Sequence, residues 1–180
     1  MTTEKLLPLT VRLETVVADA LRFKAASAGQ EAADYAASLL TEALMDVIRA
    51  ADADAARRLK AELEIKARAI MLARQLSPAG GFDPNVTLKV FQAIRHNGDL
   101  NEIYIRAIGG KPGDERGNPI KARINRSLGA IVKTAVQADV ETIGNNPVKV
   151  QVSGEFIFSY TLLKPSSGKA RAHAAQAAAA

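Results

Sequence analysis

The stretch that decides the fold of this chain is Leu7–Leu13, which reads LPLTVRL. Large apolar side chains occupy every second position of this stretch, with Pro, Thr and Arg between them. Because successive side chains of a β-strand point to opposite faces, this period of two predicts a short, half-buried strand. Pro8 has no N–H to donate, so the strand belongs at the edge of a sheet.

Two helices are predicted directly after this strand. Thr15 is expected to cap the first helix, and Gly29 is expected to end it. The second helix carries apolar side chains at helical spacing between Tyr35 and Val47. The strand has no partner within this segment, and a second copy of the same strand is the simplest one. The segment therefore predicts a two-fold homodimer.

The order of strand, helix, glycine and helix over residues 1–48 resembles the ribbon-helix-helix family of DNA-binding proteins. In that family two chains pair their strands into a ribbon, and its polar face enters the major groove. The resemblance implies that Thr10 and Arg12 contact base edges, since arginine can donate two hydrogen bonds to guanine. It also implies contacts with DNA phosphates from Lys5, Gly29 and Gln30.

Residues 49–82 are expected to form a charged spacer helix and a linker. A helix is predicted over residues 46–76, where Glu62 and Lys66 form a favourable pair four residues apart. Its narrow apolar stripe indicates an exposed helix. The Pro- and Gly-containing stretch Ser77–Gly81 then marks the boundary to the next domain.

Residues 83–164 are predicted to form a small α+β domain. Asp83 with Pro84, Asp99, and Asn118 with Pro119 are expected to begin three successive helices. From residue 140 onward the apolar pattern changes to a period of two, which predicts two or three strands. A tight hairpin turn is expected at residues 153–154.

This order of three helices followed by strands is similar to that of a winged helix, a variant of the helix-turn-helix. The similarity implies a recognition helix at residues 119–137 and a wing near residues 144–148. A different α+β binding or oligomerisation domain is the alternative. The residues expected to contact DNA phosphates from this domain are Lys121, Arg123, Arg126, Lys133 and Lys149.

The composition of the 180-residue chain excludes several functional classes. It has no cysteine and two histidines, so neither a thiolate metal site nor a cysteine nucleophile is available. No enzyme activity, metal or cofactor is expected. No apolar run approaches the length that crosses a bilayer, so a cytoplasmic protein without a membrane partner is predicted. Residues 165–180 are predicted to form a disordered, Ala-rich basic tail.

The charge is unevenly distributed. The whole chain carries +5, yet residues 1–48 hold four basic and seven acidic side chains, a net charge of −3. The overall basic charge is typical of a protein with a polyanionic partner, but the segment that resembles a DNA-binding module is acidic. Specific DNA binding would therefore depend on a few strand residues.

Together these patterns predict a mainly α fold with short β-strands: an N-terminal ribbon-helix-helix dimerisation module, a spacer helix and a C-terminal α+β domain. The expected function is that of a homodimeric, sequence-specific repressor of transcription that binds double-stranded DNA, with pairing of dimers into tetramers left open. One alternative is a plasmid or phage nucleoprotein for partition, mobilisation or packaging. The other is a protein–protein interaction or inhibitor module that does not bind DNA.

Overall fold

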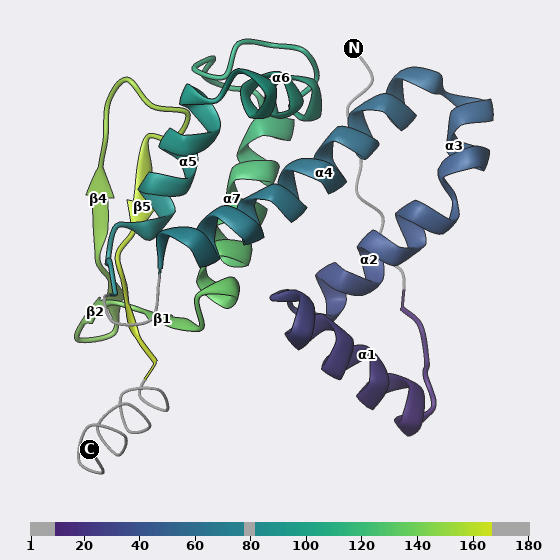
Figure 1. Ribbon diagram of the computed structural model, residues 1–180, viewed down its shortest axis with the longest axis horizontal. Coiled ribbons are helices and arrows are strands. Elements are labelled where there is room, and N and C mark those ends of the chain that lie inside the picture. Colours follow the sequence, from purple (N-terminus) through teal and green to yellow (C-terminus); the bar gives the residue numbers. More distant parts are fainter. Residues whose placement is uncertain (1–9, 78–81, 167–180) are drawn as a thin grey trace.

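Helix α4 (Ala53–Leu76) is the element around which the other helices pack (Figure 1). The computed structural model describes residues 10–77 and 82–166. One face of α4 is buried at a spacing of four residues, and its small side chains allow α5 (Val86–His96), α6 (Gly98–Ala107) and α7 (Pro119–Ala135) to lie against it. The prediction of an exposed helix is therefore wrong for this face, which consists of Ala61, Ile65, Ala69 and Ala73.

Three shorter helices precede α4. Helices α1 (Thr15–Ala28) and α2 (Ala32–Ala43) meet at Gly29, whose φ of 73° is the left-handed conformation that favours glycine. Helix α3 (Met45–Ala51) ends at Asp52, whose carboxylate accepts a hydrogen bond from the Ala55 amide at 2.9 Å and caps α4. The helix predicted over residues 46–76 is therefore two helices.

The expected end of the first helix at Gly29 is confirmed, but its expected cap is wrong. Glu14 occupies the N-cap position without a side-chain hydrogen bond, and Thr15 is already helical. The predicted strand over residues 7–13 is not formed over the part that the structure describes. Its described part, residues 10–13, is in neither helix nor strand, and residues 7–9 lie outside the described ranges. A strand needs a partner for its backbone hydrogen bonds, and none of the described strands pairs with this segment.

The caps of the C-terminal helices follow the sequence in one case of three. The Asn118 side chain accepts a hydrogen bond from the Lys121 amide at 3.1 Å, and Pro119 is the first residue of α7, as predicted. Helix α6 is capped by Asn97 two residues before the expected Asp99. Helix α5 also begins later than expected, because the Asp83 carboxylate accepts from the Asn85 amide in a turn before the helix.

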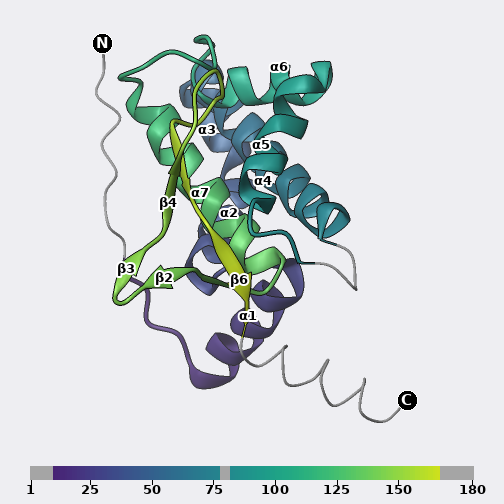
Figure 2. The ribbon, with the colours of Figure 1, turned by 90° about the vertical axis from the view of Figure 1, so that its left-hand side faces the viewer.

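Six short strands follow α7, and all of their pairings are antiparallel. Strand β1 pairs with β6, β2 with β3, and β4 with β5. They lie on the side of the helices opposite α1–α3, and α7 lies between them and α4 (Figures 1 and 2). The strands are β1 (Ala138–Val140), β2 (Thr142–Ile143), β3 (Asn146–Pro147), β4 (Lys149–Gln151), β5 (Ser159–Thr161) and β6 (Leu163–Pro165).

The three pairs of strands meet at a ring of three backbone hydrogen bonds. The Glu141 amide donates to Leu162 at 2.8 Å, the Leu162 amide donates to Val148 at 2.9 Å, and the Val148 amide donates to Glu141 at 2.9 Å. Each chain segment that passes through this junction therefore leaves one strand pair and enters another. The ring satisfies backbone groups at the junction and lets the β2–β3 hairpin leave the other two pairs.

The hairpin between β4 and β5 differs from the prediction. A tight turn was expected at residues 153–154, but residues 152–158 form a longer loop. The loop is long because Phe156 and Ile157 in its middle are buried in the core. The Phe156 ring stacks on Tyr104 with 4.7 Å between centroids, and a Cβ atom at Gly113 would lie only 2.4 Å from the Phe156 ring. The alternating pattern predicted a strand where these packing contacts require a loop.

These elements confirm the predicted fold class, which is mainly α with short β-strands. The described chain is mainly helical, with short antiparallel strands in its C-terminal part. One core joins α4, α5, α6 and α7 to the strands, and its largest fully buried side chains include Ile65, Phe91, Ile94, Tyr104, Ile124 and Leu128.

Candidate nucleic-acid interface

The two residues predicted to read bases lie in an exposed segment before α1. Thr10 and Arg12 are both exposed, and neither side chain has a hydrogen-bond or ion-pair partner among the described residues. Both are therefore available to a partner molecule. Lys5, the third predicted contact near this segment, lies outside the described residues.

The turn between α1 and α2 is not open to a phosphate in this structure. Gly29 is buried, and a Cβ atom there would lie 3.3 Å from Cα of Ala135 at the end of α7. Arg74 of α4 also donates a hydrogen bond to the carbonyl of Ser27 at 3.2 Å. The expected phosphate contacts from Gly29 and Gln30 are therefore not supported, because α4 and α7 cover this turn.

The N-terminal helices leave an unusual amount of apolar surface uncovered. Between residues 10 and 51 only Ala25 and Gly29 are buried. Val11 and Leu13, on the apolar face of the LPLTVRL stretch, are 57% and 46% exposed, and Phe23 of α1 is 71% exposed. The other large apolar side chains exposed here are Val16, Val17, Leu39, Leu40, Leu44 and Val47. We call these nine side chains the N-terminal apolar surface. Many exposed large apolar side chains in one part of a chain are a feature of interaction surfaces.

Two of the cations predicted on α7 are occupied inside the protein. Arg123 donates two hydrogen bonds of 2.7 Å to the carboxylate of Glu62, and Lys66 donates a third, also at 2.7 Å. Lys121 is 4% exposed, donates to the Glu115 carbonyl at 3.0 Å and lies over the Phe158 ring. Lys121 and Arg123, which were predicted to contact phosphate, therefore bind groups of this chain instead.

The electrostatics of this cluster follow from its burial. Burial alone would raise the pKa of Glu62, but the hydrogen bonds and positive charges of Arg123 and Lys66 outweigh it and lower the pKa to about 2. Burial lowers the pKa of Lys121 below its ordinary value. Glu62 thus remains an anion that joins α4 to α7, which is a structural role.

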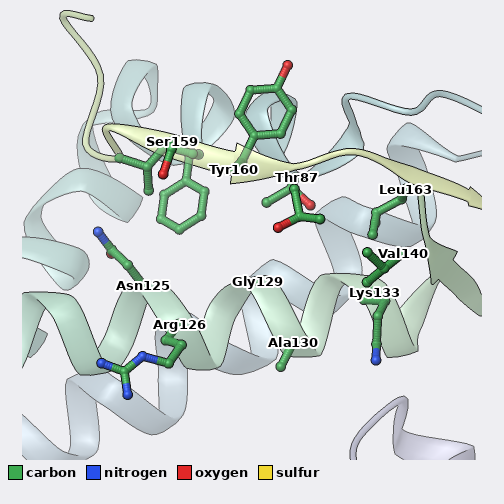
Figure 3. A pocket seen from close by; sticks show the side chains of 13 residues that line it. Thr87, Asn125, Arg126, Gly129, Ala130, Lys133, Val140, Ser159, Tyr160 and Leu163 are labelled. Atoms are coloured by element: carbon green, nitrogen blue, oxygen red, sulfur yellow. The ribbon is translucent and has the colours of Figure 1, made fainter. Parts of the chain in front are cut away.

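Arg126 and Lys133 remain available on α7. Both line a groove of about 350 Å³ between α7 and the strands β5 and β6 (Figure 3). Neither has an ion-pair partner within residues 10–77 and 82–166. Asn125, one turn before Gly129, also lines the groove, but its amide is engaged by Tyr104 and by the carbonyl of Phe156. Asn125 is therefore held by this chain, whereas Arg126 and Lys133 are held by none of the described residues.

The last predicted phosphate contact, Lys149, is exposed on β4. It follows the β2–β3 hairpin, where Gly144 has a φ of 60°, at the position expected for a wing. Lys149 therefore lies on a different element from Arg126 and Lys133, which both lie on α7. Among the residues predicted to contact phosphate, Arg126, Lys133 and Lys149 have no partner within the described part of the chain.

Sequence reasoning missed the groove and the role of Glu62. The groove forms because residues near positions 87, 126 and 160 come together from a helix, a second helix and a strand, and no local pattern reports that meeting. The charge pair of Glu62 and Lys66 was visible in the sequence, but the partner that matters most, Arg123, is 61 residues away.

The described part of the chain offers no site for a metal, since no group of three or more His, Asp or Glu side chains comes together there. None of its helices combines the length and hydrophobicity that crossing a bilayer requires. Comparison with known proteins found no matching family model, curated protein or solved structure.

Proposed function

We propose that this protein is a homodimeric, sequence-specific DNA-binding protein whose N-terminal segments pair into a β-ribbon that reads the major groove. The observation that carries the proposal is the N-terminal apolar surface, next to two exposed polar side chains on the same segment. Pairing of two LPLTVRL stretches would cover Val11 and Leu13 and leave Thr10 and Arg12 on the opposite face. A regulator that represses transcription by occupying its operator fits this arrangement.

Affinity for the DNA backbone and recognition of its sequence would come from different residues. Residues 1–48 carry a net charge of −3, so attraction to the DNA backbone has to come from cations elsewhere in the chain. Lys149 on β4 is one such residue, and within the acidic segment Lys5 adds a cation just before the ribbon. Base-specific contacts would come from Arg12, as a bidentate donor, and from Thr10.

The test is binding of the full-length protein to the DNA sequence that it selects from a random pool. Arg12→Ala is expected to weaken binding to this sequence by about 1–3 kcal/mol, because a bidentate contact to a base is lost, while the dimer remains intact. Fluorescence anisotropy measures the affinity. Arg106→Ala is the matched control, since Arg106 is exposed on α6, and it should bind as the unmodified protein does.

Equal affinity of the Arg12→Ala variant and the control would remove the ribbon from the proposal. The selected DNA also separates two roles: one palindromic site indicates a repressor, whereas an array of direct repeats indicates a nucleoprotein for partition, mobilisation or packaging.

A protein–protein module is the second candidate, and the acidic N-terminal segment with its apolar surface favours it. Such a module would bind random DNA weakly at every salt concentration. A DNA-binding protein would lose affinity steeply as salt rises, because bound counterions are released from the DNA.

A further inference from the structure

The groove between α7 and the strands has the size and lining of a small-molecule site. Its volume of about 350 Å³ lies within the range of pockets that hold such ligands. Its apolar surface comes from four side chains on α5, the β4–β5 loop and two strands: Phe91, Ile157, Val140 and Leu163. An apolar surface of this kind suits the body of an organic molecule and has no counterpart in a DNA phosphate.

The charge of the groove is positive. Arg126 and Lys133 both line it, seven positions apart on α7, and none of the lining residues is acidic. Side chains seven positions apart lie on the same face of a helix, and Figure 3 shows the two charged ends at the rim of the groove, directed away from Thr87 and the strands. Their charges are balanced by no partner in the described residues, which favours an anionic ligand.

A buried hydroxyl also faces this groove. Thr87 of α5 is only 6% exposed, and its side chain forms no hydrogen bond with any described residue. It lines the groove and lies between α7 and the strand in Figure 3. The Thr87 hydroxyl is therefore available to a molecule in the groove.

The free edge of β5 supplies further donors. The Val152 amide donates to Phe158, and Val150 pairs with Tyr160 in the register of β4 and β5. Hydrogen-bonded pairs alternate with non-bonded pairs in an antiparallel ladder, so the backbone groups of Ser159 and Thr161 point away from β4. Both residues line the groove.

We propose that the groove between α7 and β5 binds a small organic anion, whose charge is attracted by Arg126 and Lys133 at the rim of the groove and whose polar end accepts a hydrogen bond from the Thr87 hydroxyl. The apolar body of the ligand lies on Phe91, Ile157 and Leu163. An aromatic or aliphatic phosphate or carboxylate has this chemistry. The site does not depend on the N-terminal segment, so it stands or falls separately from DNA binding.

The test is titration of the ¹⁵N-labelled full-length protein with phenyl phosphate, followed by NMR. Saturable shifts are expected at the amides of Thr87, Gly129, Ser159 and Thr161. Phenol and inorganic phosphate, each of which supplies half of the ligand chemistry, should each bind at least about tenfold more weakly. Lys133→Ala should weaken phenyl phosphate about tenfold, because one of the two positive charges that attract the ligand is lost. Lys60→Ala, on the exposed face of α4, is the control and should change nothing.

A blocking variant keeps the test independent of charge. A Cβ atom at Gly129 meets no other atom within 4 Å, so Gly129→Leu should fold and fill the groove. It should abolish the phenyl phosphate shifts. Gly98→Leu at the start of α6, where a Cβ atom is equally free, is the matched control and should bind normally.

Three results would overturn the proposal: unchanged binding to the Gly129→Leu protein, shifts confined to the N-terminal apolar surface, or no saturable shift at millimolar phenyl phosphate. Groove shifts caused by a short DNA duplex but not by phenyl phosphate would assign Arg126 and Lys133 to DNA instead. Loss of DNA binding in the Arg12→Ala protein with the groove shifts intact would leave this site standing.

Discussion

Residues 10–51 differ from residues 53–77 and 82–166 in how far their large apolar side chains are buried. In the C-terminal part, α4, α5, α6, α7 and the strands enclose one core, and side chains such as Ile65 and Leu128 have no exposed surface. In the N-terminal part the large apolar side chains lie on the outside. The difference teaches that the C-terminal part is stabilised by its own packing, whereas the N-terminal part gains little from packing within its own chain, and our proposal is that a second copy covers it.

The largest effect is expected at the buried ion cluster that joins α4 to α7. Glu62→Ala leaves Arg123 and Lys66 without their anion, and removing one partner of a buried pair costs about 3–5 kcal/mol of unfolding free energy. Urea denaturation measures the loss. Glu102→Ala, an exposed carboxylate on α6, is the control and should stay within about 0.5 kcal/mol. A loss of similar size in both variants would show that Glu62 is not a structural anion.

The same substitution placed in each region compares them directly. Leu128→Ala empties a fully buried position and should cost about 2–5 kcal/mol at any protein concentration. Leu40, which is 48% exposed on α2, packs little within its own chain, so Leu40→Ala should cost much less in dilute protein. At higher protein concentration, Leu40→Ala should weaken association of the chains more than Leu128→Ala does. Thermal unfolding at several concentrations separates the two, and equal, concentration-independent losses would contradict the comparison.

Lowering the pH should weaken the C-terminal part through Glu62. Its pKa of about 2 in the folded protein lies below the ordinary value of 4.5, so its contribution is complete above pH 5 and is lost as the pH falls toward 2. The shift corresponds to about 3 kcal/mol. The difference in unfolding free energy between the unmodified protein and Glu62→Gln, measured by urea denaturation, should therefore shrink over this interval. A difference that stays constant from pH 7 to pH 2 would contradict the assignment.

Local signals in the sequence were enough for some elements. Gly29 and the pair Asn118-Pro119 fix the end of one helix and the start of another, because each acts on backbone groups only a few residues away. The helical periods in the C-terminal part and the change to strands near residue 140 follow the same logic.

Long-range packing decided what the sequence did not reveal. Arg123 and Arg126 are both arginines on the polar face that the sequence predicts for this helix. Only Arg123 binds Glu62 of α4. The burial of α4 and the insertion of Phe156 into the core also depend on neighbours distant in sequence. Lys121 and Arg123, two of the predicted phosphate contacts, bind groups of this chain for this reason, since a polar helix face does not tell whether solvent or another helix lies beside it.

The N-terminal strand poses a different problem. A strand can be predicted from LPLTVRL, but a strand needs a partner for its hydrogen bonds, and residues 10–13 pair with no described strand. The missing strand and the N-terminal apolar surface thus have one proposed explanation.

Sedimentation equilibrium of the full-length protein over a range of concentrations tests this explanation most directly. We expect a mass of twice the 19.1 kDa chain at micromolar concentration. Phe23→Ser on the N-terminal apolar surface should shift the equilibrium toward the monomer, whereas Met71→Ser, at an exposed position of α4, should not. A protein that remains monomeric throughout this range, or a dimer that the Phe23→Ser change leaves untouched, would contradict the account.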